Sequence, residues 1–106
     1  MEKTLETLKA LSDKNRMRVV AALWRFDELC ACQITELLTV SGATASRHLG
    51  ILQKAGLVDS RKEGRWVYYR LRQPIKSELL FQWLEHSLGG ADELVKDFQS
   101  LKKIVG

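Results

Sequence analysis

Apolar residues recur at helical spacing through the first quarter of the chain. Leucines at positions 5, 8 and 11 predict a short amphipathic helix over residues 2–11. Ser12 and Asp13 can cap a second helix that continues to about Phe26. The side chains expected on the inner face of this second helix are Met17, Val20, Ala21 and Trp24.

Two more helices, separated by a tight turn, are predicted in the following segment. The acidic pair Asp27-Glu28 suits the positive end of a helix dipole, so a third helix is expected from here to about Leu38. Ser41 is a good N-cap for a fourth helix over roughly residues 42–55, and Gly56 is suited to ending it. The residues of the fourth helix expected to point inward are Ala45, Leu49 and Leu52. Those expected to point away are Thr44, Arg47, His48 and, one turn later, Ile51 or Lys54.

A β-hairpin and a C-terminal helical region complete the pattern. Residues 57–62 and 65–71 have the composition of strands, with Glu63-Gly64 as a loop in which the glycine supplies a positive φ. Pro74 opens the C-terminal region, which is expected to bend at Gly89-Gly90. Helix, turn, helix and hairpin follow one another in the order of a winged helix-turn-helix.

The predicted fold is therefore mainly α with a β-hairpin wing. We expect one domain over residues 1–106, with the helix-turn-helix at about 31–55, the wing at 57–72 and C-terminal helices at 74–105. A core of this size is modest, so dimerisation would add useful burial. No apolar run is long enough to span a bilayer, and the first four residues lack the apolar stretch of a signal peptide, so we expect a cytoplasmic protein.

The positive charge of the chain is concentrated in the predicted hairpin. The formal net charge is +4, and residues 61–72 carry five positive charges against one negative, while the rest of the chain carries twelve of each sign. A polyanion is the natural partner of such a segment. The residues predicted to contact DNA, from the fourth helix and the hairpin, are Ser41, Thr44, Ser46, Arg47, His48, Arg61, Lys62 and Arg65. The alternative is that Arg47 and His48 only form a solvated helix face.

Four segments together resemble the ArsR/SmtB family of metal-responsive repressors. They are Leu8-Lys9-Ala10-Leu11-Ser12-Asp13, Ser46-Arg47-His48-Leu49-Gly50-Ile51-Leu52, Ala55-Gly56-Leu57-Val58 and the hairpin from Arg61 to Leu71. The resemblance implies a homodimer paired through the first and last helices. It also implies binding to an inverted-repeat operator in double-stranded DNA and repression of a resistance operon.

Cys30 and Cys32, separated by one residue, are best interpreted as a reactive pair. The segment Glu28-Leu29-Cys30-Ala31-Cys32 is similar to the family's sensor motif, which implies that the pair is the metal site. Soft thiolates select soft ions, so the expected inducer is trivalent arsenic or antimony, as arsenite, antimonite or an organoarsenical. Unpaired N–H groups at a helix start are expected to lower the thiol pKa.

Helical geometry constrains how the pair closes on one atom. Residues two apart on an α-helix differ by about 200° in direction, so both sulfurs cannot reach one atom in a regular helix. Binding therefore requires that the segment around Cys30 leaves helical geometry or is already frayed. We hypothesise that the ligand unwinds the first helix of the helix-turn-helix and so changes the spacing of the recognition helices.

The family's third sensor cysteine is replaced here by Thr35, and the C-terminal helix carries only His86, so the family's zinc site is expected to be absent. Cadmium and zinc, which prefer four ligands, are disfavoured. Three alternatives remain: buried structural cysteines, a regulator gated by thiol oxidation or by a protein partner, and an enzyme with a cysteine nucleophile. The enzyme is disfavoured because neither His48 nor His86 is placed to serve as its base, and no catalytic cofactor is expected.

Overall fold

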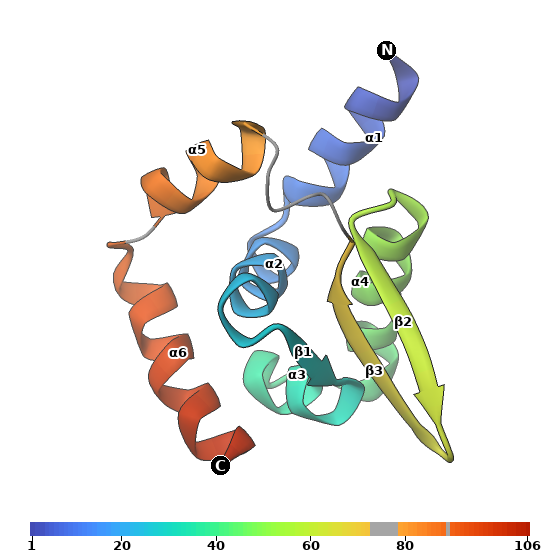
Figure 1. Cartoon of the computed structure of the whole chain (residues 1–106), viewed down its shortest axis with the longest axis vertical. Helices are drawn as coiled ribbons and strands as arrows, with labels where there is room; N and C mark the ends of the chain where they lie inside the picture. Colours follow the sequence, from blue (N-terminus) through green and yellow to red (C-terminus); the bar gives the residue numbers. More distant parts are fainter. Residues whose placement is uncertain (73–78, 89) are drawn as a thin grey trace.

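Helix α2 (Lys14–Phe26) runs through the middle of the molecule, between the C-terminal helices on one side and the sheet with helix α4 (Gly42–Lys54) on the other (Figure 1). The computed structural model describes residues 1–72, 79–88 and 90–106. The other elements are α1 (Glu2–Leu11), β1 (Glu28–Cys30), α3 (Ala31–Leu38), β2 (Val58–Glu63), β3 (Trp66–Leu71), α5 (Leu79–Leu88) and α6 (Asp92–Val105). The start of the predicted C-terminal region, residues 74–78, and Gly89 of the predicted bend lie outside the described residues. None of the described helices could span a membrane.

The turns and caps around the helix-turn-helix follow the sequence pattern. Asp13 and Ser41 accept hydrogen bonds from the backbone N–H of Arg16 and Thr44, each at 3.1 Å, and begin α2 and α4 as predicted. Gly56, with φ of +79°, follows the end of α4. Gly64 has a positive φ, but the hairpin loop is Gly64-Arg65, one residue later than expected, because Glu63 pairs with Trp66.

The first part of the predicted third helix is a strand. Asp27 has φ of +52° and turns the chain out of α2, after which Glu28–Cys30 pairs antiparallel with β3. The sheet order is β1-β3-β2. The prediction that a helix starts at Asp27-Glu28 is therefore wrong, because the backbone groups of residues 28–30 find partners on the hairpin. Helix α3 begins three residues later, at Ala31.

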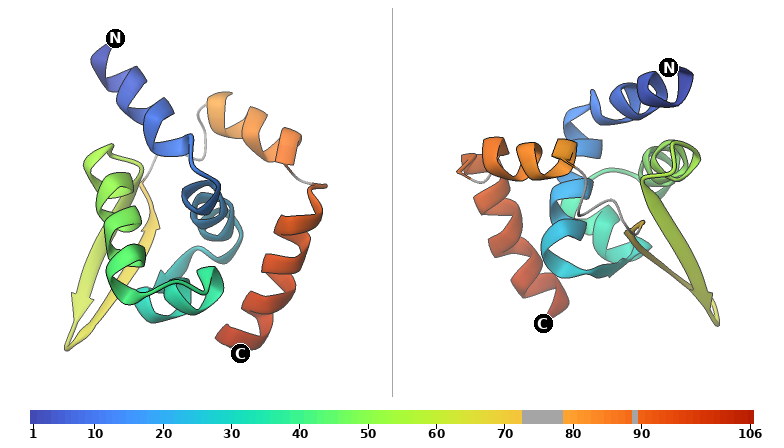
Figure 2. Two further views of the ribbon diagram at one scale, coloured as in Figure 1. Left: turned by 180° about the vertical axis from the view of Figure 1, so that it is seen from behind. Right: turned by 45° about the horizontal axis from the view of Figure 1, so that its top comes forward.

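The core surrounds α2 on more than one side. Val19, Ala22 and Leu23 are fully buried, and on the predicted inner face Val20 is buried while Met17 and Trp24 pack against the core. The predicted face borders a cavity of about 510 Å³, where Val20 and Trp24 lie opposite α5 and α6. One face of α2 turns to the sheet side and the other to the C-terminal helices (Figure 2). Figure 2 also shows the β2–β3 hairpin extending beyond the helices, on the side away from α6.

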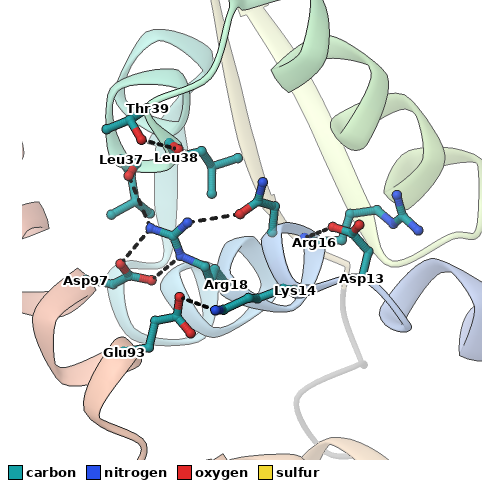
Figure 3. Close-up of polar contacts among 10 residues, drawn as sticks. Asp13, Lys14, Arg16, Arg18, Leu37, Leu38, Thr39, Glu93 and Asp97 are labelled. Atoms are coloured by element: carbon teal, nitrogen blue, oxygen red, sulfur yellow. Dashed lines mark hydrogen bonds and ion pairs between the residues drawn. The ribbon is translucent and has the colours of Figure 1, made fainter.

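A buried ion pair attaches α6 to the rest of the fold. The guanidinium of Arg18 on α2 donates through Nε and Nη2 to the two carboxylate oxygens of Asp97, each at 2.9 Å (Figure 3). Nη2 also donates to the carbonyl of Leu37 on α3, at 3.3 Å. Asp97 is only 5% exposed, so both its oxygens depend on this partner. The nearby pair between Lys14 and Glu93 is exposed.

These two pairs predict different losses of stability. Asp97→Ala leaves the Arg18 guanidinium largely buried without its carboxylate, so it should lower the free energy of unfolding by about 3 kcal/mol. Glu93→Ala removes a solvent-exposed pair and should cost less than about 1 kcal/mol. Urea unfolding at one protein concentration measures both. Equal losses for the two variants would contradict this description of the α6 attachment.

Candidate functional site

The outer face of α4 presents hydrogen-bonding groups to solvent. Ser41, Ser46 and Arg47 are exposed and Thr44 is half-buried. The Ser41 hydroxyl lies 3.0 Å from that of Thr44, so the two form one polar group at the start of the helix. Arg47 forms no ion pair within the described part of the chain. These four residues therefore offer polar side chains to solvent along the N-terminal half of α4.

His48 does not belong to this surface, contrary to the sequence prediction. It is 4% exposed, because α4 buries it against the junction of α1 and α2. Its Nδ1 lies 3.2 Å from a guanidinium nitrogen of Arg16 and 3.9 Å from a carboxylate oxygen of Asp13. Arg16 also donates to the carbonyl of Ala10, at 2.7 Å. The backbone N–H of Arg16 holds the pKa of Asp13 below its usual value. His48 thus anchors the recognition helix instead of presenting atoms to a groove.

The three wing residues predicted to contact DNA have different surroundings. Lys62 and Arg65 are exposed and form no ion pair among the described residues, while the Arg65 guanidinium lies 5.3 Å from the ring centre of Trp66. Arg61 is exposed as well, but its guanidinium is bound by two carboxylates, those of Glu28 and Glu63. Sequence reasoning missed the contact with Glu28 because β1 was expected to be helical.

The two cysteines meet at the start of α3. Cys30 is the N-cap residue, in extended conformation with φ of −70° and ψ of 148°, and Cys32 lies in the first turn. Their sulfurs are 2.7 Å apart, with one thiol donating to the other. Cys30 is buried, whereas Cys32 is exposed. The pair is therefore open to solvent through one of its two sulfurs.

A capping box keeps the two thiols together. The Cys30 sulfur accepts a hydrogen bond from the backbone N–H of Cys32 at 3.3 Å, and the Gln33 side chain accepts from the N–H of Cys30 at 2.8 Å. Since Cys30 already stands outside the helix, no unwinding is needed to bring the sulfurs together. Of the two alternatives that the sequence left open, the structure therefore has the second, in which the segment around Cys30 already lies outside helical geometry. The capping role of Gln33 was also missed.

The expected drop in thiol pKa is not found at Cys32. The hydrogen bond with the Cys30 thiol raises the pKa of Cys32, and desolvation adds to the rise, while backbone N–H groups at the helix start oppose it. The Cys32 thiol therefore favours its protonated form, and a ligand that binds it as a thiolate must displace its proton.

Other donors near the pair are limited. The Thr35 hydroxyl, in place of a third cysteine, donates to the carbonyl of Ala31 at 2.8 Å. His86 is exposed on α5. The described residues contain no cluster of three or more histidine, cysteine or acidic side chains arranged to hold a metal ion. Within this part of the chain, the thiol site offers two sulfurs.

Comparison with known proteins identifies the family and agrees with the fold. Residues 13–60 match the model described as bacterial regulatory protein, arsR family. The Arsenic resistance transcriptional regulator ArsR1 of Pseudomonas putida is 36% identical over 92 residues, covering 87% of this chain and 68% of that protein. The chain belongs to the ArsR family. ArsR proteins form a family of DNA-binding regulators and not of enzymes.

Two further ArsR comparisons bear on ligand and assembly. The Cadmium resistance transcriptional regulatory protein CadC of Listeria innocua is 50% identical over 64 residues, which are 60% of this chain and 54% of that protein. The chain therefore spans about half the length of this relative. The homodimeric winged helix-turn-helix DNA-binding domain Mb0332 of Mycobacterium bovis superimposes with a TM-score of 0.68 at 26% identity, covering 90% of this chain and 83% of that one. The winged helix-turn-helix architecture predicted from the sequence is confirmed.

The different positions of Arg47 and His48 predict different effects on operator binding. Arg47→Gln should weaken binding and reduce the number of counterions released on binding by about one, since it removes an exposed cation from the predicted DNA-binding residues. His48→Gln should leave the salt dependence unchanged and lower the melting temperature, because it disturbs a buried anchor. Operator titration at several salt concentrations, with thermal unfolding alongside, measures both. A reduced salt dependence with unchanged stability in His48→Gln would contradict this assignment.

Proposed function

We propose that this ArsR protein represses a metal(loid) resistance operon and leaves its operator when trivalent arsenic or antimony binds Cys30 and Cys32. The observation that carries the proposal is the 2.7 Å contact between the two sulfurs, of which one is exposed. A single soft ion can bind both sulfurs without unwinding α3, because Cys30 stands outside that helix. The pair lies at the start of α3, the first helix of the helix-turn-helix, where ligand binding can affect DNA contact.

Donor number favours arsenic or antimony over cadmium. Two thiolates suffice for an organoarsenical, and arsenite needs only a small thiol or solvent to complete its shell. Cadmium and zinc prefer four ligands. Because the chain is 50% identical over 64 residues to a cadmium resistance regulator, cadmium is the second candidate inducer.

The proposed DNA surface combines α4 and the wing. We assign Ser41, Thr44, Ser46 and Arg47 to the major groove or its phosphates. Lys62 and Arg65 then reach the neighbouring backbone from the hairpin. A homodimer paired through α1 and the C-terminal helices would read an inverted repeat. Its formation would cover apolar side chains that this chain exposes, including Leu5 (48% exposed), Leu8 (47%) and Trp83 (61%).

Thiol oxidation is the competing trigger. Two sulfurs in contact can join as a disulfide when an oxidant such as a peroxide removes two electrons and two protons, and this would also change the start of α3. The two triggers share the same cysteines and differ in the reagent that causes release. A protein partner as the trigger would require neither reagent.

Substitution of the cysteines tests the proposal. Cys30→Ser and Cys32→Ser should bind the operator like the wild type, since neither thiol belongs to the proposed DNA surface. Each should lose release by arsenite, because one thiolate alone cannot hold the ion between two sulfurs. Ala31→Ser is the matched control, as it adds the same hydroxyl to this segment but keeps both thiols. Fluorescence anisotropy of a labelled operator measures binding and release.

The outcomes distinguish the candidate triggers. Release of the serine variants by arsenite would place the sensor elsewhere and contradict the proposal. Release of the wild type by cadmium but not by arsenite or antimonite would favour the second inducer. Release by peroxide alone would establish the redox trigger.

A further inference from the structure

One row of residues crosses the sheet from the thiol site to the wing. Cys30 on β1 is opposite Tyr68 on β3, and Tyr68 is opposite Arg61 on β2. Residues directly opposite in antiparallel strands project from the same face of the sheet. The Arg61 guanidinium accordingly lies over the Tyr68 ring, 4.5 Å from its centre. A sensor residue and a wing residue are thus separated by a single side chain.

Arg61 also spans the sheet through an ion pair. Its Nε and Nη2 donate to the two carboxylate oxygens of Glu28, at 2.8 and 2.7 Å. Glu28 lies on β1, two residues before Cys30, and projects from the same face. The two parallel hydrogen bonds fix the direction of the guanidinium as well as its distance. Arg61 therefore joins the strand of the buried thiol to the outer strand of the wing, over the central strand.

Carboxylates of this chain already occupy three of the five N–H donors of the guanidinium. Its Nη1 donates to Glu63 at 2.8 Å, so the three nitrogens each have a carboxylate partner and one face is covered by Tyr68. Arg61 holds the pKa of Glu28 below its usual value, so Glu28 stays charged as its partner near neutral pH. A phosphate would have to displace these carboxylates. Lys62 and Arg65, on the same hairpin, form no such ion pairs among the described residues.

We propose that Arg61 is the link between the thiol site and the wing, and not a DNA contact. The part of this inference that concerns the response of the wing to a ligand rests on the proposed function. A ligand that closes on Cys30 and Cys32 shifts β1. The Glu28–Arg61 bonds carry the shift to β2, while the strand pairing carries it to β3. The position of the whole wing then responds to the ligand, which a change confined to α3 would not achieve.

The first test uses DNA binding without any inducer. Arg61→Gln and Glu28→Gln should both keep the salt dependence of the wild type, because neither residue contacts a phosphate. Lys62→Gln is the matched control on the same strand. It should reduce the number of counterions released on operator binding, which is read from the salt dependence, by about one. Two results would overturn the inference: a loss of one counterion in Arg61→Gln, or tighter binding with a steeper salt dependence in Glu28→Gln. The second would show that Glu28 only withholds Arg61 from DNA.

The second test measures release by phenylarsine oxide, a trivalent arsenical that needs two thiolates. The ratio of operator dissociation constants with and without the arsenical should fall at least about threefold in Arg61→Gln and in Glu28→Gln. The double variant should show no further fall, because both substitutions remove the same contact. Glu63→Gln is the control, since its pair with Arg61 stays within the hairpin and does not reach β1.

The remaining outcomes separate the inference from the proposed function. The inference would be overturned, while the proposed function stands, if both single variants had the same ratio of dissociation constants as the wild type. Additive effects in the double variant would have the same consequence. If the arsenical does not release the wild type, the proposed function fails and the transmission step fails with it. The salt dependence still decides in that case whether Arg61 contacts DNA.

Discussion

The pairing of β1 with β3 is the interaction on which the site depends. Asp27 turns the chain at a positive φ, and the next three residues extend along the hairpin instead of continuing as a helix. This gives Cys30 its extended backbone at the N-cap of α3, and so allows its sulfur to meet that of Cys32. The same pairing brings Glu28 within reach of Arg61. One short strand thus assembles the thiol pair and attaches it to the wing.

Local signals in the sequence predicted much of this architecture. Ser41 and Gly56 mark the ends of the recognition helix through their own capping chemistry, and Gly64 marks the hairpin through its positive φ. The thiol pair was also identifiable, since two cysteines one residue apart require no knowledge of tertiary contacts. Features of this kind depend on neighbours in the chain, so a single sequence displays them.

The features that were missed depend on partners far away in the chain. Glu28 is compatible with a helix start, and only the presence of β3 makes it part of a strand. His48 has a polar side chain at a helical position that looked exposed, but Arg16, 32 residues earlier, gives it a buried hydrogen-bonding partner. Arg61 was predicted to contact DNA, but its guanidinium is paired with Glu28, a residue 33 positions earlier in the chain. Buried or paired polar groups of this type are specified by tertiary geometry, which periodicity does not contain.

Amide hydrogen exchange of the operator-free protein, with and without phenylarsine oxide, tests most directly whether the thiol site acts on the wing through the sheet. Exchange should change in β1 and along the β2–β3 hairpin, because the strands share their hydrogen bonds, while α6 stays near its original rates. The hairpin lies outside the segment that binds the arsenical, so a change there reports transmission. A change confined to the start of α3, with the hairpin unaffected, would contradict the coupling of sensor and wing.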